Sequence, residues 1–192
     1  MQQIVTSRRD AIRTAGLGTL SAGAFAVLAG APSAAAAALG KTSSGDIETL
    51  NVALALEHEG IAAYQIGAES GLLKGDVLQA AVLFQGHHKG HRDELAKVIR
   101  TLGGKPVESR PIAEYARELD VANTIKGPND VLALAQRLER GATAAYLGII
   151  PGLEDPDMKH LAARLAADES AHFAVITAVL GQAIPAKTFI FE

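Results

Sequence analysis

Glu169 and His172 lie three residues apart in an apolar helical pattern that runs from residue 161 to residue 181. Residues i and i+3 of a helix share one face. The same face carries four apolar side chains, those of Leu165, Ile176, Val179 and Leu180. The pattern therefore predicts a carboxylate and an imidazole that point into a helical core, where they need partners because burying an unpaired charge is costly. Carboxylate oxygen and imidazole nitrogen are also ligands for iron, manganese and zinc.

The chain repeats this arrangement at an offset of 81 to 82 residues. The equivalent pairs are His88 with Glu169, His91 with His172, Glu57 with Glu139, and Tyr64 with Tyr146. In both halves the Tyr follows the Glu by seven residues, which is two helical turns and the same face. A repeated helix hairpin predicts a pseudo-twofold bundle in which equivalent positions meet at the centre.

Four long helices are needed to position these residues. We predict them from Asp46 to about residue 73, from Gly75-Asp76 to Gly103-Gly104, from Asn129 or Asp130 to Ile150, and from Asp155-Pro156 to Gly181. Asp before a helix, Pro at its first position and Gly after its end are the usual boundary residues. The further inward positions predicted on the first three helices are Leu50, Ala53, Leu54, Ile61, Leu83, Phe84, Leu95, Val98, Ile99, Leu102, Leu132, Ala135, Thr143 and Ile150.

The second and third helices are joined by a long segment, residues 105–128, which contains Pro106, Pro111 and Gly127-Pro128. A short helix is expected within it, at residues 112–120. About 24 residues can span the roughly 40 Å length of a 27-residue helix. The predicted fold is therefore all-α, a ferritin-like four-helix bundle with a long crossover between helices 2 and 3.

Residues 46–181 resemble the ferritin-like superfamily, and most closely its exported bacterial ferritin-like domain proteins. The motifs that carry the resemblance are LNVALALEHEGIAAY, LAQRLERGATAAYLG and AADESAHFAVITAVLG. The resemblance implies metal ligands at Glu57, His91, Glu139, Glu169 and His172, with His88 added by register. It also implies that Tyr64 and Tyr146 donate hydrogen bonds to the ligand carboxylates, although both would equally suit core tyrosines with a satisfied hydroxyl.

His88 departs from the family pattern, which has a Glu at this position that usually bridges two metals. The chain therefore offers three Glu and three His in place of four Glu and two His. An imidazole nitrogen binds one metal and cannot bridge as a carboxylate does. The exchange also removes one negative charge, which favours a lower metal charge or weaker binding at one position.

A different register would use Gln85 and His88, but it puts Arg92 where the fourth helix has Ile176, so the apolar stripe favours His88 and His91. Five polar residues near the candidate ligands fall off the inward stripe and are predicted to be solvent-exposed. They are His58, Glu59, His87, His160 and Asp168.

The composition excludes several other classes of protein. Cysteine is absent, which excludes disulfides, thiolate metal sites and a catalytic Cys. The net charge is −3 with no basic tract, so nucleic acid is not an expected partner. The sequence contains no nucleophile elbow and no glycine-rich phosphate loop, which disfavours a hydrolase.

Residues 1–38 have the pattern of a signal peptide. Ser7-Arg8-Arg9-Asp10 resembles the twin-arginine export motif, and a mild apolar region and the run Ala34–Ala38 follow it. Cleavage after Ala36, Ala37 or Ala38 would leave residues 39–192 as the bundle domain, with a net charge of −5. An uncleaved N-terminal anchor is the alternative.

These patterns predict a periplasmic or secreted metal-binding protein with two ions of iron, manganese or zinc per chain. By resemblance, its partners would be oxygen or peroxide, in ferroxidase, peroxide-detoxifying or iron-handling chemistry under oxidative stress. The alternative is a metal-free bundle that acts as a structural or interaction module in the cell envelope, with the apolar tail at Phe189-Ile190-Phe191 as its docking element. We expect a monomer or homodimer with no membrane span after cleavage.

Overall fold

The computed structural model describes residues 43–191, and within this range every regular element is helical. Four helices are long: α2 (Ser43–Glu69), α3 (Gly75–Thr101), α6 (Pro128–Ile149) and α7 (Pro156–Val179). Three are short: α4 (Ile112–Glu118), α5 (Val121–Thr124) and the 3₁₀ helix η2 (Ile150–Gly152). The predicted signal peptide lies outside the described residues.

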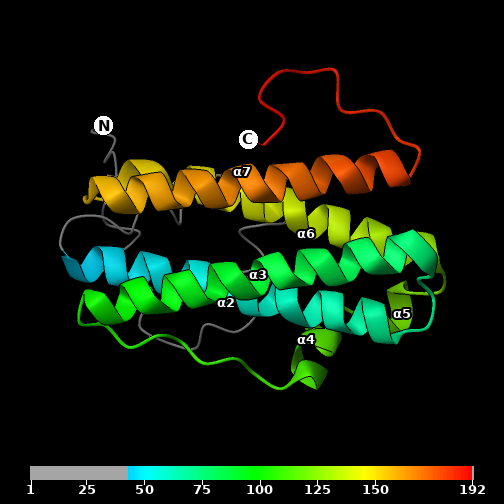
Figure 1. Cartoon of the computed structure of the whole chain (residues 1–192), viewed down its shortest axis with the longest axis horizontal. Coiled ribbons are helices and arrows are strands. Elements are labelled where there is room, and N and C mark those ends of the chain that lie inside the picture. The colour runs from blue at the N-terminus through cyan, green and yellow to red at the C-terminus, as the bar shows by residue number, and fades with distance from the viewer. Residues whose placement is uncertain (1–42, 192) are drawn as a thin grey trace, which may run out of the picture.

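The long helices form two antiparallel hairpins, α2 with α3 and α6 with α7, which pack together as a four-helix bundle (Figure 1). The connection from α3 to α6 runs back along the bundle and contains α4 and α5 (Figure 1). The all-α ferritin-like bundle with a long crossover between its second and third long helices is therefore confirmed.

The boundaries of the second hairpin follow from local sequence. The Asp155 side chain accepts a hydrogen bond from the Asp157 backbone N–H at 2.7 Å, and Pro156 takes the first position of α7. After the end of α7, Gly181 adopts φ +67°, a left-handed conformation that favours glycine. The Asp130 side chain accepts hydrogen bonds from the backbone N–H groups of Lys126 and Gly127, which fixes Gly127 as the residue before the helix. Helix α6 therefore begins at Pro128, one residue before Asn129, the earlier of the two predicted starts.

The apolar core lies on both sides of a polar middle layer. At one end, Leu50, Leu95, Ile99 and Leu161 pack together with other buried residues. At the other end the core contains Tyr64, Leu73, Phe84, Val131 and Ile176. Because Glu57 lies on α2 between Leu54 and Tyr64, the predicted ligand positions fall between these two apolar regions.

Two residues that we predicted to point inward are exposed: Leu83 is 56% exposed and Val179 is 47% exposed. The buried face of α3 is centred on Phe84, His88 and Leu95, and each helical residue turns by about 100°, which carries Leu83 towards solvent. Val179 is the last residue of α7, where the bundle ends beside an apolar cavity.

The C-terminal tail packs back on its own bundle. The Phe191 ring lies edge-on to Phe173 with the ring centroids 5.4 Å apart, and Arg140 donates a hydrogen bond to the Ile190 carbonyl. The tail that we considered as a docking element therefore packs along its own bundle, although Phe189 itself is exposed. Over residues 43–191 no helix combines the length and apolar character that crossing a membrane requires.

Candidate metal centre

All six candidate ligands are buried in the middle of the bundle, with exposed fractions between 0 and 9%. Glu57 comes from α2, His88 and His91 from α3, Glu139 from α6, and Glu169 and His172 from α7. Their side chains form two groups in which the candidate ligand atoms lie within 4.8 Å of one another. The groups are Glu57, His88, His91 and Glu169, and His88, Glu139, Glu169 and His172.

Each carboxylate in the cluster faces an imidazole. His88 lies between two of them, with Nδ1 2.7 Å from Glu57 Oε2 and Nε2 3.3 Å from Glu139 Oε1. Glu169 lies between the other two imidazoles, with His91 Nδ1 3.1 Å from Oε1 and His172 Nδ1 3.0 Å from Oε2. Glu169 and His88 are thus the residues common to both groups, at equivalent positions of the internal repeat.

Each of the two tyrosines donates a hydrogen bond to a carboxylate of the opposite hairpin. The Tyr64 hydroxyl on α2 donates to Glu139 Oε1 on α6, and the Tyr146 hydroxyl on α6 donates to Glu57 Oε1 on α2. Burial, together with the nearby carboxylates, raises the pKa of both tyrosines well above the usual value. Both hydroxyls therefore keep their protons and remain donors at neutral pH.

The charges of the cluster balance internally. Burial alone would raise the pKa of Glu57, but the attraction and hydrogen bonds of His88 and His91 outweigh it and hold that pKa at about 2. The pKa of Glu139 is lowered against burial in the same way, by His172 and His88. Burial raises the pKa of Glu169, only partly opposed by His88, His172 and His91.

The imidazoles respond in the opposite sense. Burial would lower the pKa of His91, but Glu169 and Glu57 raise it to about 10, and carboxylates likewise raise the pKa values of His88 and His172. Protons on the imidazoles thus neutralise the buried carboxylates. Divalent cations would neutralise the carboxylates in place of these protons. A metal ligand must be deprotonated, so metal binding would release the protons.

The residues present fit bound metal ions. Glu139 Oε2 is buried without a hydrogen-bond partner, and it lies 3.4 Å from His172 Nδ1. An orphaned carboxylate oxygen inside a cluster of O and N donors is an available ligand atom. The donor set of carboxylates and imidazoles without thiolate suits iron or manganese, and zinc is also compatible.

Gly60 gives the His88 ring its space. A Cβ atom at Gly60 on α2 would lie 3.1 Å from both Cε1 and Nδ1 of His88, which is tighter than most packing contacts. The equivalent position in the second half of the chain is Ala142, in the hairpin that has Glu169 in place of an imidazole. The larger ring at residue 88 is therefore matched by a smaller residue on the facing helix.

Two residues that we predicted to be solvent-exposed are covered by the connection between α3 and α6. Glu59 is only 6% exposed, and the half-buried His58 lies with Nε2 3.1 Å from the Val107 carbonyl. Helix α4, which follows Val107, packs against α2. The prediction was wrong for Glu59 because helical periodicity does not show that an irregular segment covers the outer side of α2.

His87 and Asp168 are exposed as predicted, yet each contacts a candidate ligand. His87 Nδ1 lies 2.9 Å from His172 Nε2, and Asp168 Oδ2 lies 3.1 Å from His91 Nε2. These contacts fix the ring nitrogens that point away from the cluster, as the outer partners of metal-binding histidines usually do. The sequence signal that we missed is the repeat itself, since His87 and Asp168 are 81 residues apart and occupy equivalent positions. His160 is exposed, as predicted.

Gln85, which the disfavoured register would have used as a ligand, has a different role. Gln85 is buried, but its amide donates to Gln65 Oε1 at 2.7 Å and to the Ile61 carbonyl at 3.1 Å. These partners lie on α2, one to two turns beyond Glu57. Gln85 therefore serves the packing of α2 against α3, and it belongs to neither donor group.

Comparisons with known proteins agree with this architecture. The profile of the ferritin-like domain family matches residues 45–182. A crystal structure of a conserved hypothetical protein, rv2844, from Mycobacterium tuberculosis is similar in fold, with a TM-score of 0.62 and 19% sequence identity. The match covers 77% of this chain and 99% of that one. None of the curated proteins matches this chain at a significant level.

The fit between Gly60 and His88 predicts that two glycine-to-alanine changes differ in sign. Gly86 lies within α3 with no atom within 4 Å of an added Cβ, so Gly86→Ala should stabilise the protein by roughly 1 kcal/mol through helix propensity. Gly60→Ala should destabilise it, because the new methyl group pushes His88 away from Glu57. Urea unfolding of both variants without metal measures the difference, and equal stabilisation by both would contradict the fit.

Burial of Glu59 predicts a dependence of stability on pH. Burial, with the Glu118 charge added, raises the pKa of Glu59 from 4.5 to about 8. The folded state therefore binds this proton more tightly than the unfolded state, and its contribution to stability is lost as pH rises through this window. Glu59→Gln removes this ionisable group, so its stability should not fall in this way. Between pH 5 and pH 8, the free energy of unfolding of Glu59→Gln should therefore rise relative to that of the parent by on the order of 3 kcal/mol.

Urea unfolding at pH 5 and pH 8 tests the Glu59 prediction. Glu48→Gln is the matched control, because Glu48 is an exposed residue of the same helix. Parallel stability curves for the parent and Glu59→Gln would show that Glu59 is ionised throughout.

Proposed function

Because this chain belongs to the ferritin-like domain family, we propose that it is an exported metal-binding protein with a dinuclear iron or manganese centre. The observation that carries the proposal is the pair of buried donor groups that share Glu169 and His88. Six ligand side chains around two adjoining positions are what a two-metal carboxylate site in a helical bundle requires. The proposed chemistry is the oxidation of ferrous ion by oxygen or peroxide, in a protective or iron-handling role.

Each residue of the cluster has a definite part in this function. Glu57 and His91 would hold one ion and Glu139 and His172 the other, and Glu169, which belongs to both donor groups, would supply a carboxylate oxygen to each. His88 would serve one ion, because an imidazole nitrogen does not bridge. One of the two donor groups would then offer its ion fewer protein ligands than the other, and a small exogenous ligand could complete the coordination there.

The surrounding residues orient the ligand side chains and exclude water from them. Tyr64 and Tyr146 fix the two carboxylates of the opposite hairpins, while His87 and Asp168 fix the outer nitrogens of His172 and His91. Apolar layers on both sides of the cluster exclude water, which strengthens its electrostatic interactions. Iron bound here would supply the one-electron redox chemistry that the side chains lack.

Metal titration of the protein tests this function. Chelator-treated protein should take up about two ferrous ions per chain under anaerobic conditions, as expected for two adjoining donor groups. Glu169→Ala and His172→Ala should each bind less metal and lose ferrous oxidation on admission of oxygen or peroxide, because each removes a buried donor. His160→Ala is the matched control, since His160 is an exposed histidine of the same helix.

The possible results of this titration separate the functions. About one ion per chain would indicate that His88 has altered the site. Retention of manganese or zinc alone would remove the ferroxidase assignment. Unchanged metal content in both ligand variants would overturn the assignment of the site itself.

A metal-free structural module is the second candidate. It is favoured by the mutual pairing of carboxylates and imidazoles, which satisfies most of the cluster with protons alone. The tail lends it less support, because Phe191 packs against Phe173 of its own bundle. A folded protein that takes up no ferrous ion would contradict the metal-binding function and favour this second candidate.

Export through the twin-arginine route is part of the proposal and is supported by the pattern of residues 1–38. This route carries folded proteins, so metal would be loaded before export. Replacement of Arg8 and Arg9 by Lys should keep the protein in the cytoplasm, whereas the parent should be recovered outside it with a new N-terminus near Ala38. Mass spectrometry of fractionated cells measures both, and unchanged export of the variant would contradict the route.

A further inference from the structure

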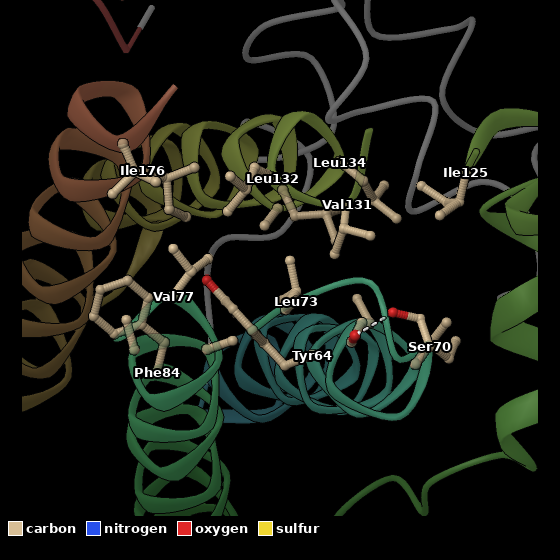
Figure 2. Close-up of a pocket in the computed structure, with 18 of the residues that line it drawn as sticks. Tyr64, Ser70, Leu73, Val77, Phe84, Ile125, Val131, Leu132, Leu134 and Ile176 are labelled. Atoms are coloured by element: carbon tan, nitrogen blue, oxygen red, sulfur yellow. Dashed lines mark hydrogen bonds between the residues drawn. The ribbon is translucent and has the colours of Figure 1, made fainter. Parts of the chain in front are cut away.

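An apolar cavity of about 280 Å³ lies between the two hairpins, at the end of the bundle where α2 ends and α3 begins. Figure 2 shows its lining, with Leu132, Val131 and Ile176 on one side and Val77, Leu73 and Phe84 facing them. The lining side chains come from all four long helices and from the connection before α6. The cavity is therefore built into the fold and does not lie in a surface loop.

The side chains that line the cavity are almost all apolar. Its polar members are Tyr64, Ser70 and Asp76, and no Lys, Arg or His is among them. The Tyr64 hydroxyl is already bonded to Glu139, and the Ser70 hydroxyl to the Gly67 carbonyl. An anionic guest would find no cation to pair with inside, and burying an unpaired charge is costly. The one carboxylate of the lining, that of Asp76, is exposed at its edge and offers a cationic guest no buried partner.

The volume sets the size of the guest. A cavity of about 150 Å³ lined by aliphatic and aromatic side chains stays dry and admits benzene. The cavity here is nearly twice as large and has the same kind of lining. Val175 and Val179 line it while being 46% and 47% exposed, so the cavity opens to solvent beside α7.

We infer that this cavity binds one small, uncharged, hydrocarbon-like molecule of about ten carbon atoms. Only the wall residues Tyr64 and Phe84 would separate the guest from the cluster of candidate ligands. Tyr64 forms part of the wall and donates to Glu139, and the wall residue Phe84 stacks on His172 with the ring centroids 4.1 Å apart. Binding depends on the cavity alone and does not rest on the proposed metal chemistry.

Naphthalene is the probe, and calorimetric titration of the full-length, chelator-treated protein is the measurement. We expect one naphthalene per chain. Naphthalene-2-sulfonate, which adds only a charged group, should bind at least tenfold more weakly. Metal is absent from this experiment, so its result is independent of whether the cluster binds iron.

Variants that fill the cavity locate the binding site. Ala135→Phe on α6 and Ala80→Phe on α3 each place a ring into the cavity from a different hairpin, and each should weaken naphthalene binding at least tenfold. Ala163→Phe is the matched control on an exposed position of α7 and should bind like the parent. Circular dichroism identifies a variant that has failed to fold, and the other filling variant then decides.

Three results would overturn the inference. They are absence of naphthalene binding by the folded parent, equal binding of the sulfonate, and full binding by folded filling variants. The first would show that the cavity is closed to small molecules, whether by another part of the chain or by a second copy of it.

Discussion

The structure depends on the burial of three carboxylates at the centre of a helical bundle. Glu57, Glu139 and Glu169 are 0 to 1% exposed, and an ionised carboxylate in such surroundings is tolerated only with charged or hydrogen-bonding partners. The partners are the imidazoles of α3 and α7 and the hydroxyls of two tyrosines. The described partners of the Glu57 and Glu139 carboxylates all lie on other helices. Glu169 has only His172 on its own helix α7, with His91 coming from α3, so the complete polar layer requires all four long helices.

The contacts that satisfy the cluster mostly cross between the hairpins. Those that do so are Tyr64 with Glu139, Tyr146 with Glu57, His88 with Glu139, His91 with Glu169, His91 with Asp168, and His87 with His172. Four of the six crossings form two pairs related by the repeat: Tyr64–Glu139 with Tyr146–Glu57, and His91–Asp168 with His87–His172. The internal repeat thus supplies both the ligands and the device that joins the two halves.

The exception to this symmetry is the exchange of Glu for His at residue 88. The ring is accommodated because Gly60 leaves space on α2, and its two nitrogens reach Glu57 and Glu139. The space at Gly60 therefore allows the imidazole to take part in the cluster without displacing α2.

The sequence was sufficient to predict the four long helices, the crossover and the convergence of the six donor residues, because each follows from helical spacing and from the repeat. The positions of Glu59 and His58 were not accessible in this way. Their burial arises from the irregular segment around Val107 and α4, which has no periodicity that would place it on α2. Leu83 was misplaced because it is turned by about 100° from the buried Phe84, and Val179 because an apolar stripe does not show where a bundle stops being closely packed.

The polar layer also explains why the two ends of the bundle differ. Hydrogen bonds and ion pairs across the middle have fixed lengths, so they set the separation of the hairpins on both sides. At one end Leu50, Leu95 and Ile99 are long enough to fill this separation. At the other end small residues face the gap, among them Ala63, Gly67, Ala80, Ala81 and Ala135. Empty space costs the contacts that its walls would otherwise make, and collapse would recover them only by breaking the polar layer. The polar layer therefore opposes closure of the cavity, because bringing the hairpins closer at this end would disturb the hydrogen bonds of the buried carboxylates.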